Sequence, residues 1–137
     1  MIIADTGFWV ALGSPRDDYH ALAIRIFSAL DEPLITTWPV MTEVCHLLLQ
    51  RRGIEAQLKF IEMYRQAVFT VLDIDSGQAE RLEALMRAYA DLPMDLADAS
   101  LVLLAETLGH GRILSTDRRD FHTYRWKSNR PFENLLS

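Results

Sequence analysis

The chain opens with Met1-Ile2-Ile3-Ala4-Asp5, a short apolar run that ends in a carboxylate. Two later segments resemble it: Leu34-Ile35-Thr36-Thr37 comes shortly before Glu43, and Arg112-Ile113-Leu114-Ser115-Thr116 comes directly before Asp117. Short apolar runs separated by helical stretches are typical of buried parallel strands. Because ligands of an open parallel sheet bind beyond the carboxyl ends of its strands, we expect these acids to converge on one pocket.

Helical periodicity alternates with short β-rich runs along the whole chain, which predicts an α/β domain. We expect strands over residues 2–5, 33–37, 68–74 and 112–116, with 121–126 as a candidate last edge strand. Helices are expected over residues 6–12, 39–53, 54–67, 76–90 and 95–108, and Asp17 or Asp18 is expected to cap a further helix that follows them. The prediction is one domain over residues 1–137, with three α/β/α layers and a four- or five-stranded, mainly parallel sheet.

The composition argues against several classes of protein. The 137 residues are 50% hydrophobic and carry a net charge of −5, which excludes a broadly basic nucleic-acid-binding surface. Residues 112–137 nevertheless hold six basic and three acidic residues. The single cysteine, Cys45, cannot form an internal disulfide, and no apolar run approaches the roughly 18 residues of a membrane span. We therefore expect a cytoplasmic protein with no membrane partner.

Asp95 and Asp98 are three residues apart and would share the first turn of an apolar helix, where the helix dipole favours anions. Asp95 suits either a helix cap or an outer position around a bound ion. Asp98 has apolar neighbours on nearly all sides, and a carboxylate in such surroundings needs a partner or a metal.

Asp5 and Asp117 could each be a simple helix cap, and Glu43 could lie on a solvated helix face. Their recurrence after successive strands favours a joint role. Clustered carboxylates resist joint ionisation unless a divalent ion neutralises them, and oxygen-only ligation suits Mg²⁺, with Mn²⁺ as a substitute. The predicted metal site consists of Asp5, Glu43, Asp98 and Asp117, with Asp95 as an uncertain fifth member.

Four segments in order resemble the motifs of a PIN domain, and together they extend from Ile2 to about Tyr124. They are Ile2-Ile3-Ala4-Asp5-Thr6, the pair Thr42-Glu43, Asp95-Leu96-Ala97-Asp98-Ala99-Ser100, and Thr116-Asp117-Arg118-Arg119-Asp120-Phe121. Asp5, Glu43, Asp98 and Asp117 match the four acidic positions. Thr6 and Thr116 match the accompanying hydroxyl positions. Asp120 belongs to the frequent D-x-x-D-F ending, where it would either support the loop or bind the metal ion.

The resemblance implies an Mg²⁺-dependent ribonuclease of the VapC type, the toxin half of a toxin–antitoxin pair, and favours a homodimer. The expected reaction is cleavage of single-stranded or loop RNA by a metal-activated water, leaving 5′-phosphate and 3′-hydroxyl ends. The four histidines are scattered, so an acid/base histidine pair is not expected. His46, three residues after Glu43, suits an outer water-orienting role or an ordinary helix surface.

A basic strip beside Asp117 consists of Arg118, Arg119, Arg125, Lys127 and Arg130, interleaved with Tyr124 and Trp126. Such a strip could hold RNA phosphates and stack on bases, or could be a solvated sheet edge. We weigh Arg118, Arg119, Arg125 and Lys127 as candidate RNA contacts.

Two other classes of protein compete with a nuclease. A response-regulator receiver needs a carboxylate pair after the first strand and a lysine after the last, whereas Asp5 stands alone and no lysine lies between Lys59 and Lys127. A catalytically silent RNA-binding or protein-interaction module with the same fold is the stronger alternative. The four retained acids argue against it, because their repulsion is costly without a metal.

Overall fold

The computed structural model describes residues 1–136. At its centre is a five-stranded sheet in the order β3-β2-β1-β4-β7, in which every neighbouring pair is parallel. The strands are β1 (Ile2–Ala4), β2 (Leu34–Thr37), β3 (Phe69–Leu72), β4 (Arg112–Leu114) and β7 (Glu133–Asn134). The parallel α/β sheet predicted from the alternating pattern is confirmed.

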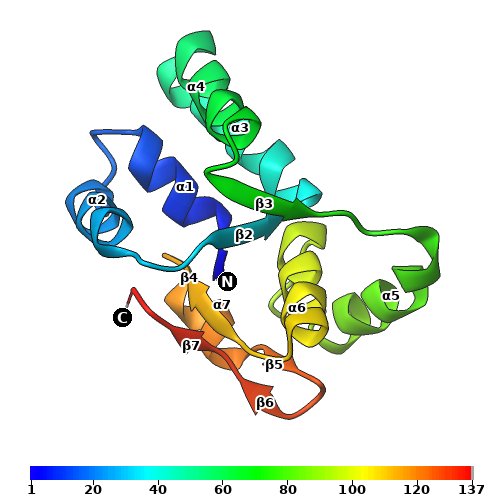
Figure 1. Cartoon of the computed structure of the whole chain (residues 1–137). Helices are drawn as coiled ribbons and strands as arrows, with labels where there is room; N and C mark the ends of the chain where they lie inside the picture. Colours follow the sequence, from blue (N-terminus) through cyan, green and yellow to red (C-terminus); the bar gives the residue numbers. More distant parts are fainter. Residues whose placement is uncertain (137) are drawn as a thin grey trace.

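Helices cover both faces of this sheet. They are α1 (Thr6–Gly13), α2 (His20–Ala29), α3 (Trp38–Arg52), α4 (Ile54–Arg65), α5 (Ala79–Ala88), α6 (Leu96–Leu108) and α7 (Arg118–Thr123), with the short 3-10 helix η1 (Ser76–Gln78) before α5. In Figure 1, α1 and α2 lie on one side of the sheet and α5 and α6 on the other. The connections between parallel strands are right-handed crossovers. Connections that move along the sheet in opposite directions therefore place their helices on opposite faces. None of the helices in residues 1–136 has the length and apolarity that crossing a membrane requires.

Helix α6 lies in the core of the domain. Every residue from Ala99 to Ala105 is buried, and the helix packs against β1 and β2. Because a helix that leads into a parallel strand runs antiparallel to it, the first turn of α6 lies at the carboxyl end of the sheet. The polar start of this apolar helix is thereby brought to the edge where the strands end.

The segment 121–126 is not the predicted edge strand. Asp117 caps a helix by accepting a hydrogen bond from the Asp120 backbone N–H at 3.1 Å, and α7 turns Phe121 into the core. Only Arg125–Trp126 is extended, as β5, and it pairs antiparallel with β6 (Arg130–Pro131) outside the main sheet. The fifth strand of the main sheet is β7, which the sequence pattern did not indicate because it is only two residues long.

The predicted aspartate cap of α2 is also wrong. Tyr19 occupies the position before the helix, and no side chain caps the helix start. Asp17 instead accepts a hydrogen bond from the Tyr19 backbone N–H at 2.9 Å within the preceding turn. The Asp17 side chain therefore stabilises this turn and does not cap α2.

Candidate active site

The predicted acids lie around the carboxyl end of the central strands. β1 and β4 are neighbours in the sheet, but the chain continues from β1 toward β2 and β3 and from β4 toward β7, so their boundary is a topological switch point. Asp5 directly follows β1, and Asp117 lies three residues after β4. Asp98 lies in the first turn of α6, and Glu43 in the second turn of α3, the helix after β2.

Asp5 is the most buried of these acids, with 6% of its surface exposed. Its Oδ1 accepts a hydrogen bond from the Thr6 N–H at 2.7 Å, and its Oδ2 accepts one from the Ser115 hydroxyl at 2.8 Å. Burial is the main cause that raises the pKa of Asp5 to about 6 despite these two donors, and the negative charges of Glu43 and Asp117 contribute to this rise. The carboxylate is therefore held in place while its charge remains poorly compensated.

Asp98 is half-buried, and its Oδ2 accepts a hydrogen bond from the phenol of Tyr124 at 2.9 Å. Burial raises the pKa of Asp98 to about 7, with further contributions from the charges of Asp95, Asp5 and Asp117, while the bond from Tyr124 opposes them. The charges of Asp5, Asp98 and Asp117 thus act on one another.

Asp117 is tied to the same pocket through its main chain. Its N–H donates to the Ser115 hydroxyl oxygen at 3.0 Å, and its side chain caps α7. The pKa of Asp117 is raised, chiefly by burial, and the neighbouring Asp120 carboxyl also raises it. Asp120 lies in the first turn of α7, the helix that Asp117 caps, and not in a loop.

The remaining predicted residues take different places. Asp95 is exposed and accepts the Asp98 N–H at 2.8 Å, which confirms the capping interpretation. Thr116 packs against α1, where a Cβ at Gly7 would overlap its hydroxyl oxygen. The Thr6 hydroxyl is buried beside Asp5 and is the one buried side-chain polar atom in residues 1–136 without a hydrogen-bond partner. His46 lies exposed on α3.

The donor set fits a hard divalent cation. Asp5, Asp98 and Asp117 all have raised pKa values, so their negative charges are disfavoured as they stand. Within residues 1–136, no three His, Cys, Asp or Glu side chains are grouped closely enough to hold a metal ion as they stand, so the fit rests on the chemistry of the donors. A cation would compensate these charges, and its water shell would offer the Thr6 hydroxyl a partner.

Ser115 and Asn134 are site residues that the sequence analysis missed. Ser115 has no exposed surface and joins Asp5 to Asp117, whereas the resemblance implied a site hydroxyl one residue later, at Thr116. Asn134 of β7 holds Ser115 in turn, because its side-chain amide accepts the Ser115 N–H at 3.2 Å and donates to the Ser115 carbonyl at 2.9 Å. Ser115 and Thr116 are neighbours at the end of a strand, and the sequence alone does not indicate which of the two hydroxyls points toward the acids.

The basic strip is only partly available for RNA. Tyr124 and Trp126 are buried, with 0% and 8% exposure, so neither ring is free to stack on a base. Lys127 is exposed, and its ammonium lies 5.9 Å from the centre of the Trp126 ring. The aromatic half of the strip therefore contributes to packing.

The arginines of the strip differ in the same way. Arg118 and Arg119 are exposed in the first turn of α7, directly after Asp117. The Arg125 guanidinium instead donates to three main-chain carbonyls at the end of α7, at 2.9 to 3.1 Å. The Arg125 side chain thus satisfies carbonyl groups at the C-terminal end of α7. Arg118 and Arg119 stay candidates for phosphate contacts.

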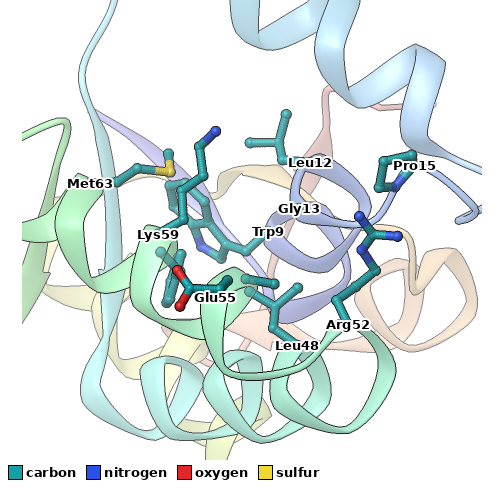
Figure 2. Close-up of a pocket in the computed structure, with 11 residues that line it drawn as sticks. Trp9, Leu12, Gly13, Pro15, Leu48, Arg52, Glu55, Lys59 and Met63 are labelled. Carbon is teal, nitrogen blue, oxygen red and sulfur yellow. The ribbon is translucent and has the colours of Figure 1, made fainter.

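A separate groove of about 400 Å³ lies between α1, α3 and α4. Figure 2 shows apolar side chains such as Trp9, Leu48 and Met63 beside the charged Arg52, Glu55 and Lys59. None of the four acids lines this groove, so it is distinct from the acidic pocket.

Comparison with known proteins agrees with this fold. Ribonuclease VapC26 of Mycobacterium tuberculosis is 24% identical over 124 residues, which cover 90% of this chain and 92% of the relative. The crystal structure of VapC20 of the same organism, a sarcin–ricin loop cleaving toxin, is similar with a TM-score of 0.80 and 22% identity, over 87% of this chain and 92% of that one. Residues 2–127 match the PIN domain family as a whole, and the chain therefore belongs to the PIN-domain family.

Proposed function

We propose that this chain is a divalent-metal-dependent endoribonuclease that cleaves single-stranded or loop RNA, and that it is the toxin of a type II toxin–antitoxin pair. The observation that carries the proposal is the set of buried and half-buried, mutually repelling carboxylates at the switch point of the sheet. The two similar proteins, a ribonuclease and a sarcin–ricin loop cleaving toxin by name, support the same function.

Asp5, Glu43, Asp98 and Asp117 would hold Mg²⁺, with Mn²⁺ as a substitute. A cation there would lower the pKa of water and neutralise charge on the phosphodiester. The protein's own contribution is to position the acids: Ser115 orients Asp5 and anchors the main chain of Asp117. Arg118 and Arg119 bring positive charge beside Asp117, where an incoming phosphate would otherwise meet only carboxylates.

The test is cleavage by protein purified free of antitoxin. With Mg²⁺ or Mn²⁺, we expect RNA cut in single-stranded segments or loops, with 5′-phosphate and 3′-hydroxyl ends, and no cutting in EDTA. The Asp98→Asn variant serves as the control for a contaminating nuclease. Cleavage that persists in EDTA, or ends that carry 2′,3′-cyclic phosphate, would exclude the proposed chemistry, and RNA binding without cleavage would favour the catalytically silent module.

The proposed partners are the RNA substrate, a cognate antitoxin and a second copy of the chain. A short reading frame for a DNA-binding protein directly upstream of the gene would support the toxin assignment, and action on cellular RNA would place the protein in the cytoplasm. Light scattering of the purified protein tests the homodimer. An antitoxin that inserts Arg or Lys among the four acids should compete with metal, so its affinity measured by titration calorimetry should fall as Mg²⁺ rises.

A further inference from the structure

Tyr124 joins the two ends of the acidic pocket. It directly follows α7, the six-residue helix that Asp117 caps at its other end. Its side chain has no exposed surface, and its phenol donates to Oδ2 of Asp98, 26 residues earlier in the chain, at 2.9 Å. One short helix therefore carries one acid of the pocket at its start and a hydrogen-bond donor to another at its end.

The Tyr124 ring is held from two sides. The rings of Tyr89 and Phe121 both meet it edge to face, with centroids 5.1 Å away in each case. Its own main-chain N–H donates to the carbonyl of Asp120 at 2.8 Å, which closes α7. Ring and main chain are both constrained, so the direction of the phenolic O–H is set by packing.

Asp98 depends on this donor. Within residues 1–136, Tyr124 is the only side chain that hydrogen-bonds to the Asp98 carboxylate. The bond occupies Oδ2 and so leaves Oδ1 as the oxygen directed elsewhere. A half-buried carboxylate without such a restraint would rotate about its side-chain bonds, and this freedom would be lost on binding a cation.

We propose that Tyr124 is a positioning residue that fixes the Asp98 carboxylate for binding the divalent cation. The inference rests on the proposed metal-dependent function. Outer-shell hydrogen bonds orient metal ligands, and their loss typically weakens metal affinity about 10- to 100-fold. Tyr124 would act on the affinity for metal and leave the reaction at saturating metal largely intact.

The experiment measures Mn²⁺ affinity directly, from the electron paramagnetic resonance signal of free Mn²⁺, in wild type, Tyr124→Phe and Tyr89→Phe. Tyr89 is the matched control, because its hydroxyl accepts the Arg125 N–H at 3.0 Å and its ring touches Tyr124 without contacting an acid of the pocket. We expect Tyr124→Phe to raise the Kd for Mn²⁺ about 10-fold or more and Tyr89→Phe to leave it within about 2-fold. RNA cleavage by Tyr124→Phe should recover at saturating Mn²⁺.

A double variant separates positioning from general packing. If Tyr124 acts through Asp98, adding Tyr124→Phe to Asp98→Asn should not weaken Mn²⁺ binding further. Circular dichroism of each variant checks that it is folded. Equal Mn²⁺ affinity in wild type and Tyr124→Phe, or equal weakening by Tyr89→Phe, would overturn the inference and leave the proposed function standing. A wild type that neither binds Mn²⁺ nor cleaves RNA would overturn both.

Discussion

The hydroxyl of Ser115 donates a 2.8 Å hydrogen bond to Oδ2 of Asp5, a residue 110 positions earlier in the chain. The same hydroxyl oxygen accepts the N–H of Asp117 at 3.0 Å. Ser115 has no exposed surface, so water cannot replace it at this position. One serine thereby sets the spacing of two acids that follow different strands.

Replacing Ser115 with Ala should weaken both the fold and the activity. The Asp5 carboxylate and the Asp117 N–H each lose a buried partner, so we expect a loss of about 1 to 3 kcal/mol in the free energy of unfolding. The pKa of Asp5 should rise further, because a donor to its charged form is gone, and the pH profile of RNA cleavage should shift upward. Urea unfolding and cleavage rates at several pH values measure these effects. Thr107→Ala is the control, since it removes a hydroxyl bound only to the Leu103 carbonyl of α6; a Ser115→Ala variant as active as this control would contradict the bridging role.

Asp98 and Asp95 should respond oppositely to neutralisation. Asp98→Asn should abolish cleavage yet leave the metal-free protein as stable as wild type or more stable, because one of several like charges is removed while its oxygen still accepts from Tyr124. It should also reduce the stabilisation that Mn²⁺ confers. Asp95→Asn should preserve activity, since Asn caps helices as well as Asp, whereas Asp95→Ala should cost about 0.5 to 2 kcal/mol. Thermal melts with EDTA and with Mn²⁺ measure both effects, and an Asp98→Asn protein that gains as much from Mn²⁺ as wild type would remove Asp98 from the site.

The metal-free protein should become less stable as pH rises. Asp5 and Asp98 have pKa values raised from 3.8 to about 6 and about 7, so the folded state binds their protons more tightly than the unfolded state. Their stabilising contribution is complete below about pH 3.8 and is lost as pH rises through these values. In EDTA, Asp98→Asn should flatten the fall in stability between about pH 4.5 and pH 8 by roughly 1 to 2 kcal/mol, after allowance for solvent screening of a half-buried group.

Mn²⁺ should reverse this trend. Metal ligands must be deprotonated, so the stabilisation that Mn²⁺ confers should grow over the same pH range. Melting curves of wild type and Asp98→Asn across this range provide the comparison. Parallel pH dependence of the two proteins in EDTA would show that the Asp98 carboxyl does not titrate as described.

The exposed arginines of α7 should affect RNA binding, and Arg125 should affect the fold. Changing Arg118 and Arg119 to Ala should raise KM and reduce the slope of log affinity against log salt by roughly 0.7 for each lost phosphate contact. Arg125→Ala should leave this slope unchanged and destabilise the protein by about 1 kcal/mol, because it frees three carbonyls at the end of α7. Arg87→Ala, on the exposed face of α5, is the control for the loss of an exposed arginine away from the site. If the double variant and Arg87→Ala show the same salt slope, the start of α7 does not contact RNA.

Local patterns in the sequence were sufficient for most of the architecture and for placing the candidate acids at one end of the sheet. The short apolar run Ile2–Ala4 predicts a buried strand, and the longer apolar stretch of α6 predicts a buried helix. Both predictions depend only on the length and spacing of apolar residues that are neighbours in the sequence. Asp5 and Asp117 could be placed in one pocket because they follow strands of a parallel sheet, whose ends share one edge. The cap formed by Asp95 is likewise a local interaction, three residues in length.

Only the tertiary structure decided how those acids are held. Ser115 meets Asp5 because β1 and β4 are adjacent in the sheet, and Tyr124 meets Asp98 because α7 packs its far end beside the start of α6. The same packing made residues 118–123 a helix and buried Tyr124, which removed it from the expected RNA surface. Contacts between residues 26 and 110 positions apart follow from strand order and packing, which leave no periodic trace in the sequence around either partner.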